Sequence, residues 1–236
     1  MDASDSHRPS SESGATAGPV SVGLTILFGY FFIAIAFGAA GRAAGLEAAA
    51  TAGFSVLVFA GASQFMAVSM IAQGAGTISI VAATLVLNLR HIVMSIALRD
   101  RLDGSAVPRP VLAFGITDEV FAASASQRGR IRDTHLLVTE ALAYSGWVGG
   151  TIVGYLVGGV LPAPLEQAMG IALYAMFVAL IVPPIRRFPR YVVPAIAAGA
   201  LNWLLQTIGV PVGIALLISI PAAAIGFAAS PGWSDP

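Results

Sequence analysis

The chain has 236 residues, of which 57% are hydrophobic and only 10% charged, and its formal net charge is zero. A soluble domain carries about 25% charged residues because its surface faces water, so this composition excludes an ordinary soluble class. The absence of cysteine excludes disulfides, thiolate catalysis and cysteine-based metal sites. A mean hydropathy of +0.84 indicates that lipid surrounds most of the surface.

The predicted elements begin after a polar, Ser-rich segment, residues 1–18, which lacks the apolar core of a cleavable signal and is expected to be a disordered tail. A transmembrane helix needs roughly 20 mostly apolar residues. Residues 19–229 are therefore expected to form a single transmembrane domain, followed by a short C-terminal tail, 230–236. The expected fold is an all-α integral membrane protein with about seven transmembrane helices and a short re-entrant or broken helix near 111–126. The expected spans are 19–41, 48–73, 76–98, 135–160, 168–184, 191–207 and 210–229.

Arginine supplies all twelve basic residues, and most of the arginines gather in three clusters between spans. These clusters lie at 99–109, 128–132 and 186–190, whereas the links at 74–76, 161–167 and 208–210 contain no arginine. The positive-inside rule places all three clusters in the cytoplasm if the 111–126 segment enters and leaves from that face. The protein is then a multi-pass protein of a prokaryotic inner (plasma) membrane. Counting back from the first cluster puts the N-terminus outside, unless 111–126 crosses fully or the second span is broken.

Polar residues form one stripe along the third span. Thr84, Asn88, His91 and Ser95 are spaced by four, three and four residues, so they share a helix face, while Arg90 points away from them. A polar stripe in a membrane favours a solute pathway, with an imidazole that can carry a proton near neutral pH. Hydrogen bonding between helices is the equally weighted alternative.

Two adjacent carboxylates, Asp118 and Glu119, interrupt the short apolar stretch. On a straight lipid-facing helix both charges would be prohibitive. A backbone break near Gly115, with Thr117 capping the helix that follows, would place both carboxylates in a first helical turn, where negative charge is favoured. Broken helices recur at transporter substrate sites. The alternative is that the carboxylates pair with Arg90 or a loop arginine and hold the fold.

Small residues mark two further segments. Gly61-Ala62-Ser63-Gln64 in the second span can unwind a helix for a ligand or permit close packing, and no glycine follows at the spacing of a nucleophile elbow. In the fourth span a four-residue glycine ladder indicates close helix packing. Its members are Gly146, Gly150, Gly154 and Gly158. Glu140, near the cytoplasmic end of that span, is expected to stay hydrated and to be a weaker site candidate.

The segments 60–65, 87–91 and 115–119, which read AGASQF, LNLRH and GITDE, resemble the AzlC-type branched-chain amino acid permeases, and order and spacing match from about 20 to 225. The resemblance implies a large subunit that exports branched-chain amino acids by secondary transport, together with a small AzlD-type membrane subunit. One departure is that relatives often carry an acidic residue just before a segment like 175–180, and this chain has none between Glu166 and Asp235.

The residues and the resemblance together predict that 19–229 is a transport domain for branched-chain or similar neutral amino acids, driven by an ion gradient. A passive channel, or a transporter for another small polar solute, is the alternative. No oxyanion-hole motif or metal-ligand cluster is found, so we expect no enzyme, cofactor, metal or nucleic-acid partner. Arg90 and the glycine ladder are expected to be structural, and the proton-coupling candidates are His91, Asp118 and Glu119. The expected substrate-binding residues are Ser63, Gln64, Asn88, Thr117, Asp118 and Glu119.

Overall fold

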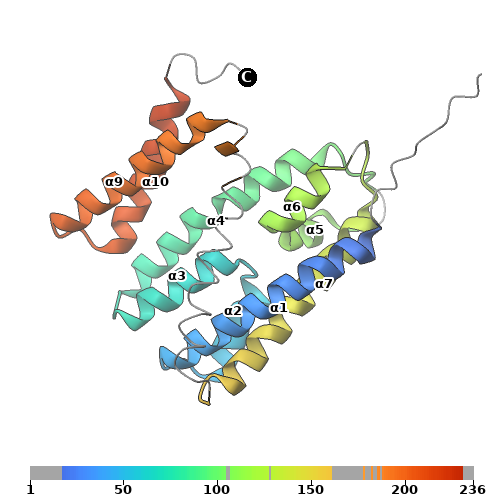
Figure 1. Ribbon diagram of the computed structural model, residues 1–236, viewed down its shortest axis with the longest axis horizontal. Coiled ribbons are helices and arrows are strands. Elements are labelled where there is room, and N and C mark those ends of the chain that lie inside the picture. Colours follow the sequence, from blue (N-terminus) through green and yellow to red (C-terminus); the bar gives the residue numbers. More distant parts are fainter. Residues whose placement is uncertain are drawn as a thin grey trace, which may run out of the picture.

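The computed structural model describes residues 18–104, 107–127, 129–160, 178, 182, 185–186 and 188–230. These residues are helical and form no β-strand, and a single isolated bridge joins Leu102 to Ile131. Three described helices are long and apolar enough to cross a membrane: α1 (Pro19–Ala43), α4 (Thr77–Arg99) and α7 (Asp133–Val157). The shorter elements are α2 (Ala48–Leu57), α3 (Gly61–Ala72), α5 (Arg109–Gly115), α6 (Asp118–Ala125), α9 (Val192–Thr207), α10 (Val212–Ala228) and the 3-10 turn η1 (Pro189–Tyr191) (Figure 1).

The predicted all-helical class is confirmed, but a count of seven spans is not. The expected span 168–184 lies outside the described residues apart from positions 178 and 182, and so do residues 1–17 and 231–236 of the two expected tails. Towards the C-terminal end, α10 packs against both α9 and α4 (Figure 1).

α1 and α7 pack side by side along their lengths (Figure 1). The glycine ladder of α7 lies directly on the backbone of α1: a Cβ on Gly146 would lie 2.5 Å from the Leu27 carbonyl oxygen, and one on Gly154 would lie 2.0 Å from that of Ile35. From the first contact to the second, the chain advances by eight residues on α7 and by eight on α1, so the two helices run parallel and in register. Only glycine allows backbones this close, and the close approach gains packing contacts in lipid, where the hydrophobic effect does not drive helix association.

The second expected span, 48–73, is wrong as one continuous helix. It is divided into α2 and α3, and the chain reverses between them. α2 starts near the C-terminal end of α7, where the Tyr155 hydroxyl donates to the Leu46 carbonyl, and it ends beside the middle of α7, where the Tyr144 hydroxyl donates to the Val56 carbonyl. α3 then returns, so the pair is a hairpin that enters and leaves from one end of the bundle.

Phe59, at the reversal between α2 and α3, has a φ of 45°, which is uncommon for a bulky side chain. Its ring is 1% exposed and packs edge-on against Tyr30, with ring centroids 6.2 Å apart. Burial of this ring therefore offsets the unfavourable backbone conformation.

α5 and α6 form a second hairpin, which enters from the opposite end. Arg109 at the start of α5 lies 3.9 Å from the Asp133 carboxylate, and Arg101 donates to the Ala125 carbonyl at the end of α6. The tip between them reaches the middle of α7, where the rings of Phe114 and Tyr144 have centroids 6.0 Å apart. The break near 111–126 is thus re-entrant in shape, with two short helices in place of one.

The two hairpins change the expected side of the N-terminus. α1 begins beside the first turns of α7, since the Thr139 hydroxyl lies 3.4 Å from the Pro19 carbonyl oxygen. The loops on either side of the α5–α6 hairpin lie at this same end (Figure 1), and they carry Arg101, Arg109 and Arg130. The start of α1 therefore lies at the same end as the first two arginine clusters and not opposite them, because the 48–73 segment reverses and does not cross.

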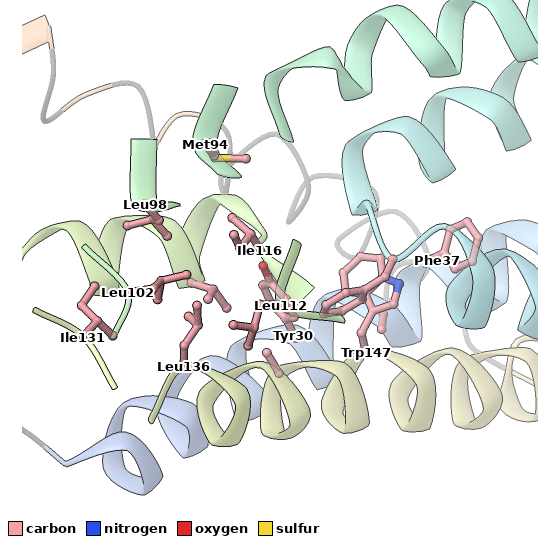
Figure 2. Packing of buried hydrophobic residues seen from close by; sticks show 14 of the residues in the cluster. Tyr30, Phe37, Met94, Leu98, Leu102, Leu112, Ile116, Ile131, Leu136 and Trp147 are labelled. Atoms are coloured by element: carbon pink, nitrogen blue, oxygen red, sulfur yellow. The ribbon is translucent and has the colours of Figure 1, made fainter. Parts of the chain in front are cut away.

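A hydrophobic core joins α1, α4, α5 and α7, and Figure 2 shows its side chains pointing toward one another. It runs from Ile131 and Leu136, near the arginine-rich end, to Tyr30 and Trp147 at the hairpin tips (Figure 2). The outer face of α4 is apolar yet exposed, as expected for a surface that faces lipid. Leu85, Leu89, Ile92, Val93 and Ile96 are all more than half exposed there.

Candidate functional site

The tips of the two hairpins meet at one pocket in the middle of the described bundle. Three further helices, α1, α4 and α7, contribute to its wall, so residues between positions 30 and 147 of the sequence meet there. The lining residues are Tyr30, Phe59, Ala60, Gly61, Ala62, Arg90, His91, Thr117, Asp118, Glu119 and Trp147. Both α3 and α6 start at this pocket, so two helix N-termini face it. A helix N-terminus attracts negative charge through its unpaired N–H groups and its dipole.

One wall of the pocket carries an ion pair. Arg90 of α4 lies 3.0 Å from the Asp118 carboxylate at the start of α6, and both side chains are about one-third exposed, at 32% and 27%. The pairing that the sequence left open therefore exists. Because both groups also line the pocket, each remains within reach of a bound solute.

Glu119 makes a different contact, with Tyr30 of α1. The Tyr30 hydroxyl donates a hydrogen bond to the Glu119 carboxylate, and it lies 2.7 Å from the Thr117 hydroxyl oxygen. Thr117 occupies the N-cap position of α6, as expected, but its side chain makes no capping bond and is turned toward Tyr30. The first turn of α6 therefore keeps its backbone N–H groups free of a side-chain cap.

Gln64 fixes the backbone at the break between α2 and α3. The Gln64 Oε1 atom accepts from the backbone N–H of Ala60, at 3.1 Å, and from the indole N–H of Trp147, at 3.0 Å. Its amide nitrogen donates to the Ser55 hydroxyl, and Ser63 donates to the Ala60 carbonyl. Ser63 and Gln64 are fully buried behind the pocket wall and do not line it.

Replacing Gln64 with leucine is expected to lower the free energy of unfolding by about 2–4 kcal/mol, because two buried N–H groups lose their acceptor. The thermal midpoint of the detergent-solubilised protein measures this loss. Gln73→Leu is the matched control, since Gln73 is exposed at the end of α3 and bonds only to Ser69. Equal midpoints for the two variants would show that Gln64 does not hold the break.

Only part of the predicted polar stripe of α4 lines the pocket. His91 lines it, and the Nε2 atom of His91 is buried without a hydrogen-bonding partner among the described residues. Asn88 and Ser95 do not line it; the Asn88 Oδ1 atom has no described partner, and the Ser95 hydroxyl donates to the His91 carbonyl. The structure thus brings Thr117, Asp118, Glu119 and His91 together and leaves Ser63, Gln64 and Asn88 outside the pocket surface.

The pocket is narrow in this conformation. Its free volume is about 20 Å³, room for about one water molecule. A larger solute requires one hairpin tip to move away from α1 and α7. Among the described residues no three histidine or acidic side chains gather in a way that could hold a metal.

A comparison with known protein families identifies the chain at this point. The family described as AzlC protein matches residues 25–161, more than half of the chain and all of the elements that build the pocket. This chain belongs to the AzlC family. The predicted resemblance is therefore confirmed, and the pocket lies within the part of the chain that defines an AzlC protein.

Several membrane proteins are similar to this AzlC-family chain. An uncharacterized membrane protein of Archaeoglobus fulgidus is 32% identical over 88% of this chain and 90% of its own length. The inner membrane protein YgaZ of Escherichia coli is 30% identical, over 75% and 76% respectively. The branched-chain amino acid transport protein AzlC of Bacillus subtilis is 24% identical, over 67% and 63%. No solved structure matches the chain.

Sequence reasoning missed two residues of the AzlC-family pocket and its surroundings. Tyr30 was hidden in an apolar span, although a lone hydroxyl in the middle of a membrane helix is itself a signal. Glu140 was expected to be hydrated, whereas the structure buries it to 3% exposure beneath the tip of the α5–α6 hairpin. The burial follows from Gly115, whose missing side chain lets the hairpin tip lie on the Glu140 carboxyl group.

Proposed function

We propose that this AzlC-family protein exports branched-chain or similar neutral amino acids by ion-gradient-driven secondary transport. The observation that carries the proposal is the charge pattern of the pocket, where Arg90 and two helix N-termini lie beside Asp118 and Glu119. An amino acid has one negative and one positive end and needs partners of both kinds. The similarity to a branched-chain amino acid transport protein of Bacillus subtilis supports the substrate class.

We assign the two ends of the substrate to different groups of the pocket. The substrate carboxylate binds Arg90 and the first-turn N–H groups of α3, where no side chain caps the helix. The ammonium group binds Asp118 and Glu119. Phe59 and Trp147 supply an apolar surface for the branched side chain. In this assignment Arg90 and Asp118 pair with each other when the pocket is empty. When substrate binds, its two charged ends replace this ion pair.

The two opposed hairpins supply a route for alternating access. Broken helices whose N-termini point at a central site, in inverted orientation, are a recurrent transporter design. The α5–α6 hairpin opens toward the arginine-rich end, and the α2–α3 hairpin opens toward the other end. With the arginine-rich end in the cytoplasm, the former admits substrate and the latter releases it, while His91 is a candidate for proton coupling.

The small free volume of the pocket argues for a transporter over a passive channel. An amino acid does not fit into about 20 Å³, so it cannot pass without a conformational change. We further propose a prokaryotic inner-membrane location and a small AzlD-type partner subunit. The exposed apolar row on α4 offers a surface that lipid or such a subunit can cover.

The test is valine efflux from proteoliposomes that contain the chain and its small subunit. We expect efflux against a concentration gradient when a proton gradient is imposed, and its loss when the gradient is collapsed. Glu119→Gln is expected to reduce efflux at least about tenfold through loss of the charge-assisted bond to the ammonium. Efflux that is independent of any ion gradient would favour a channel, and no valine movement at all would refute the substrate class.

A further inference from the structure

Glu140 of α7 is a buried acid that the proposed substrate site does not use. Its side chain is outside the pocket lining, and the residue is 3% exposed. Both carboxyl oxygens are buried, and neither has a hydrogen-bonding partner among the described residues. A charged carboxylate in such a place costs far more than a neutral one, so the conformation described here suits the protonated acid.

The described residues around Glu140 supply no counter-charge. The elements that pack on this part of α7 are α1, α5 and α6, and no ion pair or hydrogen bond joins any of their described side chains to the Glu140 carboxyl group. Arg109 is near Asp133, Asp118 pairs with Arg90, and Glu119 bonds to Tyr30. The titratable and charged groups on these elements and on α7 itself are Tyr30, Arg42, Arg109, Asp118, Glu119, Asp133, His135, Tyr144 and Tyr155.

The Glu140 carboxyl group lies directly under the backbone of the α5–α6 hairpin. A Cβ built on Gly115 would be 2.5 Å from the Glu140 carboxyl carbon and 2.6 Å from its Oε2 atom. Thr117, two residues further along, lines the substrate pocket. The hairpin tip is therefore a thin partition, with the acid on one side and the substrate site on the other.

We infer that Glu140 is the proton-binding site of the transport cycle, whose protonation state sets the position of the α5–α6 hairpin. The neutral acid is compatible with the hairpin seated on α7. The charged carboxylate requires water, which reaches it only when the tip lifts. A proton therefore favours the closed hairpin, and loss of the proton to the cytoplasm accompanies opening on that side.

A proton is a better ligand for this site than a metal cation. Hard cations such as Ca²⁺ and Mg²⁺ take six or more oxygen ligands, often several of them from protein carbonyls and carboxylates. Glu140 brings one carboxyl group to a place whose neighbours on α7, Leu136 and Ala143, belong to the hydrophobic core.

The inference rests on the proposed function and is tested with Glu140→Gln in proteoliposomes with the small subunit. Glutamine has the shape of the neutral acid but cannot release a proton. Because a neutral side chain favours the closed hairpin, we expect both the exchange of labelled for unlabelled valine and the proton-driven net efflux to fall at least about tenfold, with the amount of inserted protein unchanged. Glu47→Gln is the matched control, because Glu47 is exposed in the loop before α2.

A second readout does not depend on transport. The infrared spectrum of the unaltered protein at neutral pH is expected to contain the C=O stretch of a protonated carboxylic acid, which Glu140→Gln removes and Glu47→Gln keeps. Full valine exchange or full proton-driven efflux in Glu140→Gln, or an unchanged infrared band, would each overturn the inference. If the unaltered protein moves no valine, the proposed function fails, and the infrared band alone decides whether Glu140 holds a proton.

Discussion

Replacing Asp118 with asparagine is expected to reduce valine efflux by about 10- to 100-fold, which corresponds to the loss of one hydrogen bond to a charged group, about 1.5–3 kcal/mol. Asparagine keeps the size of the side chain but no longer attracts the ammonium group of the substrate. Efflux of labelled valine from proteoliposomes, normalised to the amount of inserted protein, measures the effect. Asp100→Asn is the matched control, because Asp100 is exposed at the arginine-rich end of α4.

The Arg90–Asp118 ion pair requires a second variant, since loss of one partner leaves the other charge unpaired. The double variant Arg90→Gln with Asp118→Asn removes both charges. If the pair only holds the helices together, the double variant should recover most of the efflux. If the two groups bind the two ends of the substrate, as proposed, the double variant stays as inactive as Asp118→Asn or becomes worse.

Gly154→Ala is expected to cause the largest loss of stability among single methyl additions in the described chain. The new Cβ would lie 2.0 Å from the Ile35 carbonyl oxygen and 2.6 Å from its Cα atom, so α1 and α7 must move apart. Overpacking of this kind costs about 1–3 kcal/mol and occasionally more. The thermal midpoint of the solubilised protein, followed by the loss of its monodisperse chromatographic peak, measures the change.

Gly149→Ala is the control for that substitution. Gly149 lies on the same helix, and a Cβ at this position would meet nothing within 4 Å. Alanine favours helix over glycine by about 1 kcal/mol, so this variant is expected to be neutral or more stable. A Gly154→Ala midpoint equal to that of Gly149→Ala would contradict the close parallel pairing of α1 and α7. It would also weaken the register that brings Tyr30 to the pocket.

Local chemistry made several parts of this fold predictable. The glycine spacing in 146–158 indicated a tight helix contact, and the contact with α1 follows every fourth residue. Asp118 and Glu119 in an apolar stretch called for a broken helix, and α6 begins at Asp118 after Thr117 takes an extended backbone. In both cases the residue types alone indicated what the alternative would cost. A glycine ladder without a close neighbour leaves a cavity, and two carboxylates on a straight helix leave unpaired charges in lipid.

Other parts depended on contacts between segments far apart in the chain. The apolar run 48–73 has the length of a span, and its reversal rests on the buried Phe59 ring and on Gln64, which bonds to Ala60 and Trp147. Glu140 was expected to be hydrated because it lies near the end of its span. Its position along the helix does not reveal that the α5–α6 hairpin covers it. The side of the N-terminus changed for the same reason, since it depends on whether 48–73 crosses.

Competition for valine exchange tests the central claim most directly, namely that the meeting point of the two hairpins binds both charged ends of a neutral amino acid. Unlabelled leucine, valinamide and isovalerate are tested as competitors of labelled valine in proteoliposomes that contain the unaltered protein and the proposed small subunit. Valinamide lacks the carboxylate, and isovalerate lacks the ammonium group. The proposed site predicts strong competition by leucine and at least about tenfold weaker competition by each of the other two. Equal competition by valinamide or isovalerate would contradict it.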